Sequence, residues 1–431
     1  MKYYLEPLGC AKNQVDAETM IASLNDAGAL FVGNPGEADL LIVNSCGFIE
    51  EAKREAINVT LNFRKIYPAK KIILTGCLAR RYFKELEQEL SEVDAVAGSD
   101  SLDDITQLAF GLTGEAPARA ASSPARVKLL SAPGSAYVKI AEGCDNRCSF
   151  CAIPLIRGRL RSRSIDDIVS ECAAHLARGL LEICLIAQDT ASYGTDTDGV
   201  CHLPELLKAL SSLEGDFWVR LLYLHPDHFP LDILETIAAD RRFLPYFDIP
   251  FQHASPTLLR AMNRRGRADT YISLIERIRN FLPDSVIRST FMTGFPGESD
   301  ADFNLLLDFQ DAARLDWLGV FVFSREEGVP AYNFKGRPSK KTARERKRIL
   351  ETRQIRITEK RMSRFTGRLM TALVEEQVDG EAGLYIGRLF CHAPEVDGSL
   401  VIESAAALLP GTFVKGLVTG QAGFDLKLRV Q

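Results

Sequence analysis

The segment from Glu142 to Pro154 reads EGCDNRCSFCAIP and places Cys144, Cys148 and Cys151 in a C-x3-C-x2-C spacing. Three thiolates so close in sequence suit an iron–sulfur cluster of the 4Fe–4S kind, which has four irons and would keep one iron open to another ligand. A structural zinc site needs four ligands and usually takes them from paired C-x2-C units, which this segment lacks. The alternative is that three unrelated thiols are buried in a core. The residues between the cysteines are mostly polar, however, and this favours a ligand-bearing loop.

Six apolar runs between residues 136 and 324 are predicted to be strands, and helical patterns separate them. Their sequences are AYVKIAEG, EICLIAQD, WVRLLYL, YFDIPFQ, VIRSTFMTG and WLGVFVF. Ser164, Ser255 and Ser299 stand where helix N-caps are expected. Six β/α units with parallel strands indicate an α/β fold, an open (β/α)6 partial barrel. The first strand would then deliver the cysteine loop to the C-terminal edge, where the active sites of barrels lie.

A second set of cysteines, Cys10, Cys46 and Cys77, is spread along the first part of the chain, with spacings of 36 and 31 residues. Each cysteine directly follows an apolar run that is predicted to be a strand of a parallel sheet. One βαβ unit takes about 30 or more residues and keeps its strands parallel, so the three thiols are expected at one sheet edge. Neighbouring strands are about 4.8 Å apart, which would bring the thiols within about 10 Å of one another. The alternative is three unrelated buried thiols, but the pattern favours a second three-thiolate cluster.

Composition along the chain predicts five segments. Residues 1–110 alternate strand and helix patterns and form an α/β domain with a parallel sheet. Residues 111–135 are rich in Gly, Ala, Pro and Ser, as is typical of a linker. Residues 136–339 form the partial barrel, and residues 340–365 form a basic helical connector. Residues 366–431 contain short β-rich runs separated by glycines and polar turns, which indicates a small antiparallel β-barrel of the OB type.

The composition is that of an ordinary globular protein, with 46% hydrophobic and 25% charged residues. The sequence has no apolar run of 18 or more residues, and its first residues, MKYYLEPLGCAKN, do not resemble a signal peptide. We therefore interpret the chain as cytoplasmic, with no membrane partner. The cytosol keeps thiols reduced, so the ten cysteines are expected to bind metal or to be buried rather than to form disulfides.

The first cysteine segment resembles the radical S-adenosylmethionine (SAM) superfamily, whose signature is C-x3-C-x-aromatic-C, with Phe150 as the aromatic residue here. The resemblance implies a 4Fe–4S cluster on these three cysteines, with SAM chelating the fourth iron. It also implies that Phe150 lies against the adenine of SAM. Gln188, at the end of the second barrel strand, is implied to contact the amino group of SAM, although a polar turn at a strand end is an equal alternative.

The two cysteine trios together resemble the methylthiotransferase family of radical SAM enzymes. GCAKNQVDAE, CAIPLIRGRLRSRS, AQDTASYGTD and FMTGFPGE look like its RimO branch, whereas the tRNA-modifying MiaB branch usually has Gln-Met in place of Ala11-Lys12. Ala17 departs from the RimO pattern, which commonly has Ser. The resemblance implies two 4Fe–4S clusters, the second one on Cys10, Cys46 and Cys77, and a C-terminal TRAM domain. It also implies ribosomal protein S-twelve as the substrate and an electron donor such as flavodoxin or ferredoxin.

The chemistry implied by this resemblance uses two molecules of SAM. One gives its methyl group to a sulfur on the second cluster. The other is cleaved at the first cluster, and its radical removes hydrogen from the β-carbon of an aspartate, which then takes the methylthio group. Two alternatives stay open: a tRNA adenosine methylthiotransferase of the MiaB type, and a non-catalytic iron–sulfur carrier or electron-transfer protein.

Charge is uneven along the chain. Residues 340–364 carry eleven Lys or Arg and three Glu, a net charge of +8, whereas residues 366–431 carry five Lys or Arg and eight Asp or Glu, a net charge of −3. An acidic barrel argues against a phosphate backbone as its main contact and favours a basic protein. Direct RNA contact is therefore secondary, and the basic helix is interpreted as a solvated connector. The four arginines from Arg157 to Arg163 are expected to form a solvated face, or else to meet SAM or an acidic substrate group.

Overall fold

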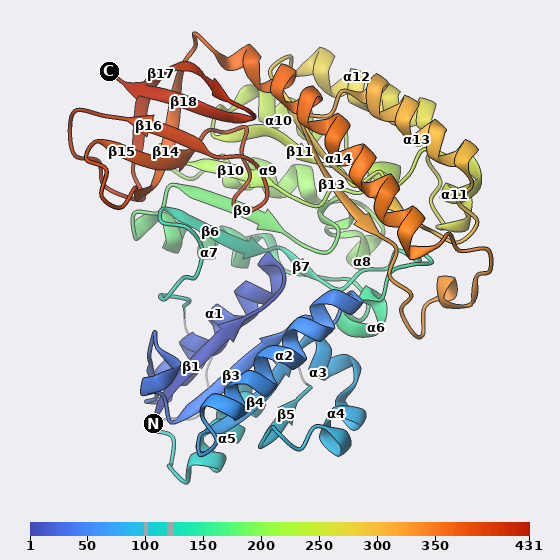
Figure 1. Cartoon of the computed structure of the whole chain (residues 1–431). Coiled ribbons are helices and arrows are strands. Elements are labelled where there is room, and N and C mark those ends of the chain that lie inside the picture. The colour runs from blue at the N-terminus through green and yellow to red at the C-terminus, as the bar shows by residue number, and fades with distance from the viewer. Residues whose placement is uncertain (99–101, 119–124) are drawn as a thin grey trace.

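The computed structural model describes residues 1–98, 102–118 and 125–431, and it begins with a parallel sheet between two helical layers (Figure 1). The strands have the spatial order β2-β1-β3-β4-β5, and all pairs are parallel. Their bounds are β1 Lys2–Pro7, β2 Leu30–Phe31, β3 Leu40–Ser45, β4 Lys71–Gly76 and β5 Ala95–Ala97. The predicted parallel N-terminal sheet is confirmed.

Both faces of this sheet are covered because the side chains of its central strands alternate between two apolar cores. Leu40 and Ile42 of β3 face one core, and Leu41 and Val43 of the same strand face the other side. The helices are α1 Ala11–Asp26, η1 Pro35–Glu37, α2 Glu50–Ile66, α3 Cys77–Arg81, α4 Phe83–Glu89 and α5 Leu102–Thr113. Helices α1 and α5 cover the first face, and α2 and α4 cover the second.

The central part is an open sheet of six parallel strands in the order β13-β12-β11-β10-β9-β6. These strands are the six that the sequence predicts, with bounds β6 Ser135–Lys139, β9 Glu182–Ile186, β10 Trp218–Leu221, β11 Phe243–Asp248, β12 Val286–Thr293 and β13 Trp317–Val322. A short antiparallel pair, β7 Ala141–Glu142 and β8 Arg161–Ser162, brackets the cysteine loop. The predicted partial barrel is therefore confirmed.

Helices cover the outer face of the partial barrel, and shorter helices lie in the loops at its mouth. They are α6 Ile153–Arg157, α7 Ile165–Ala177, η2 Thr190–Ser192, α8 Thr195–Asp198, α9 Leu203–Leu210, η3 Pro226–His228, α10 Ile233–Ala239, α11 Pro256–Ala261, α12 Ala268–Phe281, α13 Asp300–Ala313 and η4 Pro330–Asn333. The hydroxyl groups of Ser164, Ser255 and Ser299 accept backbone N–H groups at the starts of α7, α11 and α13. These three predicted N-caps are confirmed.

The basic segment forms the long helix α14 (Lys340–Met362), followed by η5 (Ser363–Phe365), and it lies along the edge of the partial barrel (Figure 1). Its buried residues recur every three or four positions, so one stripe of the helix faces the protein. Thr358 donates a hydrogen bond to the carbonyl of Asp316, and the Asp316 carboxylate pairs with Arg361 and Arg364. One side of this helix packs beside the edge strand β13, which the interpretation as a solvated connector did not foresee, and the rest of its surface is mostly exposed or half-buried. No helix in the described ranges is long and apolar enough to cross a membrane.

The C-terminal segment is a closed five-stranded barrel, as predicted, with the order β14-β15-β16-β18-β17. The bounds are β14 Leu369–Gln377, β15 Leu384–Arg388, β16 Leu400–Glu403, β17 Phe413–Ala422 and β18 Asp425–Val430. Its pairs are antiparallel except for β16 with β18, which is parallel. The loop between β15 and β16 enters the concave face of the partial barrel, where the indole N–H of Trp317 donates to the carbonyl of Cys391 at 2.7 Å.

A buried ion-pair network joins the two barrels. Glu182, fully buried in the central sheet, accepts from Arg220 at 2.8 Å and from Arg388 of the C-terminal barrel at 2.6 Å. Burial raises the pKa of Glu182, but Arg388 and Arg220 outweigh that effect and hold it at about 2. The Glu182 carboxylate is therefore charged at neutral pH and depends on both arginines.

Arg388→Met is expected to destabilise the protein by about 3–5 kcal/mol, because it removes one partner of a buried charge. Denaturation by urea, followed by tryptophan fluorescence, measures this change. The matched control is Arg429→Met in the same barrel, because Arg429 pairs with Glu403 at the exposed surface. That control should cost less than about 1 kcal/mol, and equal costs for the two variants would contradict the assigned role of the buried network.

Candidate functional site

The N-terminal cysteines lie together at the carboxyl edge of the first sheet. Cys10, Cys46 and Cys77 follow β1, β3 and β4, which are neighbours in the sheet. Cys10 is exposed, Cys46 is half-buried and Cys77 is buried. The pKa of the Cys46 thiol is raised to about 11, mainly by burial and in smaller part by the neighbouring Cys77 and Cys10. The structure therefore brings together the three thiols that the strand pattern predicts at one edge.

Glycines allow the strand ends to approach so closely. Gly9 has φ +100°, and a Cβ at this position would lie 2.8 Å from the Cβ of Cys46. Gly76 has φ +89°, and a Cβ there would lie 2.5 Å from the carbonyl oxygen of Ser45. A side chain at either position would clash and would also require a backbone conformation that only glycine adopts easily. Close packing of the three cysteine-bearing turns depends on these two residues.

The second trio lies in the loop between β7 and α6, at the C-terminal mouth of the partial barrel. The backbone N–H of Cys151 donates to the carbonyl of Cys148 at 3.1 Å, and that of Cys144 donates to Gly158 at 3.2 Å. Burial raises the pKa of Cys144 to about 11 and that of Cys151 to about 12. Part of both shifts in pKa comes from the neighbouring thiol of Cys148, so the three thiols of this trio also lie near one another.

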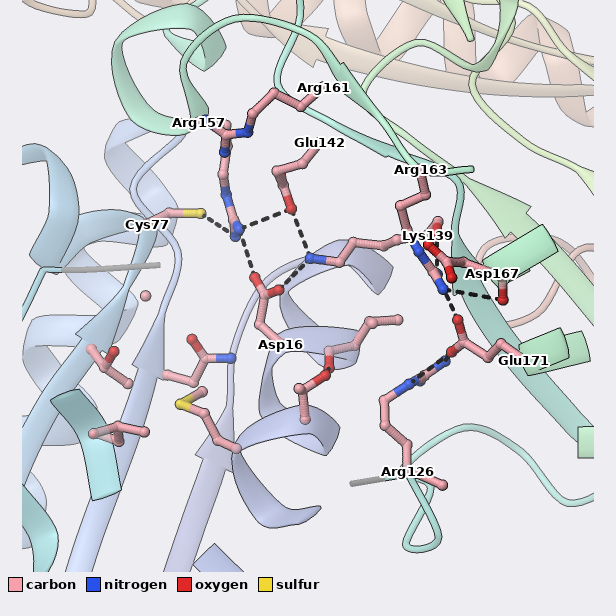
Figure 2. Close-up of a pocket in the computed structure, with 18 of the residues that line it drawn as sticks. Asp16, Cys77, Arg126, Lys139, Glu142, Arg157, Arg161, Arg163, Asp167 and Glu171 are labelled. Atoms are coloured by element: carbon pink, nitrogen blue, oxygen red, sulfur yellow. Dashed lines mark hydrogen bonds and ion pairs between the residues drawn. The ribbon is translucent and has the colours of Figure 1, made fainter. Parts of the chain in front are cut away.

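The two trios are in contact through α6. Cys77 packs against Ala152 and Ile156, and Ala152 directly follows Cys151. The guanidinium of Arg157, at the end of α6, donates to the sulfur of Cys77 at 3.0 Å (Figure 2). The two loops therefore meet across the boundary between the N-terminal sheet and the partial barrel.

A charged cavity of about 790 Å³ lies between the same two parts of the chain (Figure 2). Arg157 and Lys139 from the partial barrel both pair with Asp16 of α1, and Lys139 also pairs with Glu142. Burial raises the pKa of Asp16, but Lys139 and Arg157 outweigh it and lower the pKa below its ordinary value. These ion pairs join α1 of the N-terminal domain to the partial barrel and hold the N-terminal sheet in a fixed orientation against it.

The arginine stretch does not form one solvated face, as had been one expectation from the sequence. Arg157 is buried, whereas the side chain of Arg159 is 89% exposed and pairs with Asp145. Arg163 pairs with Glu171. Burial of Arg157 could have been inferred from its helical spacing of four residues from Ile153, but its partner Cys77 is 80 residues away and leaves no local signal.

Phe150 lies within the cysteine loop, and Gln188 is hydrogen-bonded to Glu142 just before that loop. Phe150 is half-buried against Leu258, Met262 and neighbouring apolar residues. Gln188 lies two residues beyond the end of β9, and its amide N–H donates to Glu142 at 2.5 Å. The buried amide oxygen of Gln188 accepts no hydrogen bond from the described residues, so this oxygen has a free acceptor site. Contacts of both residues with SAM stay predictions.

Asp189, which was expected with Gln188 at the end of the second barrel strand, makes buried contacts that the sequence did not reveal. It is buried and accepts hydrogen bonds from Asn146 of the cysteine loop, from Ser192 and from His228, each at 2.7 Å. The ring of His228 stacks on His225 at 4.5 Å, and burial lowers the pKa of His225 to about 3. Sequence spacing gave the histidines no role, since these contacts join separate β/α units.

The donor sets fit iron–sulfur clusters better than single metal ions. Each trio supplies three thiols, which are the usual ligands of iron in such clusters. Among the described residues, no group of three His, Cys, Asp or Glu side chains is placed to hold a single metal ion. A 4Fe–4S cluster binds each thiolate to a different iron, so its ligands need not meet at one metal ion.

Three family models match this chain, one for each part of the structure. The Uncharacterized protein family UPF0004 matches residues 2–98, the Radical SAM superfamily matches residues 138–309, and the TRAM domain matches residues 366–430. The middle match agrees with a 4Fe–4S cluster and SAM as cofactors.

Solved structures support the fold at low identity. The chain is similar to the radical S-adenosylmethionine methyltransferase TsrM from Kitasatospora setae, described with cobalamin and a [4Fe-4S] cluster bound. The TM-score is 0.55 at 15% identity, covering 77% of this chain and 76% of that one. This likeness concerns the fold alone.

Curated relatives match over nearly the whole length. Proteins named ribosomal protein uS12 methylthiotransferase RimO are 43% identical in Treponema denticola, over 97% of this chain and 98% of that protein, and 42% identical in Aquifex aeolicus, over 99% and 96%. A third, from Carboxydothermus hydrogenoformans, is 40% identical over 99% of both chains. With its three matched parts in the same order and this identity along its length, the chain belongs to the RimO family of radical SAM methylthiotransferases.

Proposed function

We propose that this protein adds a methylthio group to the β-carbon of an aspartate in ribosomal protein uS12, the S-twelve protein of the small subunit. The observation that carries the proposal is the contact between two separate thiol trios, made through Cys77, Ala152 and Arg157. A carrier of a single cluster needs only one trio. A transfer that uses a radical at one centre and a sulfur donor at the other needs both within reach of one substrate atom.

In this proposal two 4Fe–4S clusters are held by the six cysteines, one by Cys10, Cys46 and Cys77 and the other by Cys144, Cys148 and Cys151. When bound, the clusters and SAM supply the radical that removes hydrogen and the methylthio group that replaces it. Phe150 would support the adenine of SAM, and the free amide oxygen of Gln188 would accept from its amino group.

The chain's own residues position these groups. Asp189 holds the cysteine loop through Asn146, and Glu142, just before the loop, is tied to Gln188 and Lys139. Gly143 has φ +78°, and a Cβ there would lie 2.0 Å from the carbonyl oxygen of Arg159, so the loop can turn only with glycine at this position. Rigid placement of this kind is the protein's main contribution to cofactor chemistry.

The same proposal extends to partners and to the division of the chain. An electron donor such as flavodoxin or ferredoxin would reduce the clusters, the work would take place in the cytoplasm, and RNA contact would be secondary. We propose a methylthiotransferase domain at 1–110, a linker at 111–135, a radical SAM domain at 136–339, the basic helix at 340–365 and a TRAM domain at 366–431. Residues 119–124 of the linker lie outside the described ranges.

Anaerobic reconstitution with iron, sulfide and SAM, followed by reaction with purified uS12, tests the proposal. The expected result is a mass increase equal to one methylthio group replacing hydrogen, and peptide mapping should place it on an aspartate. Modification of tRNA instead of uS12 would show the rival substrate, and absence of 5′-deoxyadenosine would show a non-catalytic cluster protein. Either result would overturn the proposal.

A further inference from the structure

Lys12 places a buried positive charge beside the N-terminal trio. It lies in the first turn of α1, two residues after Cys10, and is 9% exposed. Its ammonium nitrogen lies 3.2 Å from the centre of the Tyr223 ring, which belongs to the segment after β10. The amine therefore reaches from the N-terminal sheet to the C-terminal mouth of the partial barrel, where barrel active sites lie.

This ammonium forms no ion pair with any carboxylate in the described ranges, which is unusual for a buried charge. Lys139, the other lysine at this domain boundary, pairs with both Asp16 and Glu142. Asp248 is the acid that acts on Lys12 electrostatically, but its carboxylate faces Arg288 at 3.8 Å and accepts the backbone N–H of Tyr223 at 3.2 Å. Lys12 is thus a desolvated cation that contacts the side chain of Tyr223 and lies near the thiol of Cys10, without a carboxylate partner among the described residues.

The residue that covers Lys12 is held in a strained conformation. Tyr223 has φ +64°, in the left-handed region that bulky residues rarely adopt. Its carbonyl accepts the backbone N–H of Thr190 at 3.0 Å, and its own N–H donates to Asp248, so both sides of the residue are fixed. Strain that the surroundings maintain in this way is concentrated at functional sites.

We infer that Lys12 binds the carboxylate of the substrate aspartate, an inference that rests on the proposed function. The carboxyl carbon of an aspartate is bonded to its β-carbon, so a carboxylate on Lys12 holds that carbon beside the turn that carries Cys10. A carboxylate also supplies the charge-assisted hydrogen bonds that the Tyr223 ring cannot give. Asp248 accepts from the backbone N–H of Tyr223 and faces Arg288, and it forms no ion pair with Lys12, so the ammonium is left for this partner.

The test pairs a Lys12→Met variant with uS12 in which the target aspartate is replaced by asparagine. With aspartate as the target, Lys12→Met should lower kcat/KM and weaken equilibrium binding of uS12 by roughly 10²-fold, as expected for a buried charge that loses its partner. With asparagine as the target, the same variant should change binding by less than about 3-fold. Non-additivity in this double-mutant cycle reports direct contact, and Lys12→Arg should recover part of the affinity for aspartate.

Controls separate this inference from structural damage and from failure of the proposed function. Lys70→Met is the matched control: Lys70 lies 4.7 Å from the ring of Tyr67 at the opposite edge of the same sheet, and its loss should change neither binding nor turnover. Lys12→Met should keep the wild-type iron content and should still form 5′-deoxyadenosine. Equal losses with both uS12 forms, or loss of iron, would overturn the inference. Wild-type enzyme that cleaves SAM but leaves uS12 unmodified would overturn the proposed function itself.

Discussion

Replacing Cys144, Cys148 and Cys151 together with alanine is expected to abolish SAM cleavage. In the proposed function these thiols hold the cluster at which SAM is bound, and the N-terminal trio holds a separate cluster that does not bind SAM. Anaerobically reconstituted wild-type protein should hold about eight irons per chain, and this variant about four. Formation of 5′-deoxyadenosine, measured by chromatography, should fall to background, and uS12 should stay unmodified.

The control for this variant is Cys201→Ala, which removes a half-buried thiol that packs against the core of the partial barrel and lies outside both trios. That variant should keep the wild-type iron content and SAM cleavage. A triple variant that still cleaves SAM would contradict the assignment of this trio. A triple variant that loses all eight irons would show instead that the second centre does not assemble independently.

The sequence predicted the features that are specified by residues close together along the chain. The positions of Cys10, Cys46 and Cys77 after apolar runs predicted their convergence, because parallel strands place their carboxyl ends at one edge. The six barrel strands were predicted from their apolar runs, and the three N-caps from the serine that precedes each helical pattern. In each case, the signal lies within a few residues of the feature that it specifies.

The features that could not be predicted are contacts between distant segments. Arg157 meets Cys77, Lys12 meets Tyr223, and Trp317 meets the loop at Cys391, and each contact joins residues at least 74 positions apart in the sequence. The packing of the basic helix α14 was not foreseen for a related reason, since net charge does not reveal which stripe of a helix is buried. Its Thr358 is buried although charged residues surround it in sequence.

Replacing Cys10, Cys46 and Cys77 together with alanine is expected to separate the two halves of the reaction. The variant should keep about four irons and should still form 5′-deoxyadenosine from SAM, because the loop with Cys144 has its own ligands and its own support from Asp189. Methylthiolation of uS12 should nevertheless fall to background, since the proposed sulfur donor has no ligands. Iron analysis, 5′-deoxyadenosine chromatography and mass spectrometry of uS12 measure the three outcomes.

A mixture of the two triple variants sharpens this prediction, because each then supplies the centre that the other lacks. The mixture is expected to leave uS12 unmodified, since the contact of Arg157 and Ala152 with Cys77 places both trios against each other within one chain. Separate molecules would have to present both centres to one β-carbon at once, which would lose the fixed geometry on which the transfer depends. Methylthiolated uS12 in the mixture would contradict a single shared site and would imply that the methylthio group passes between molecules.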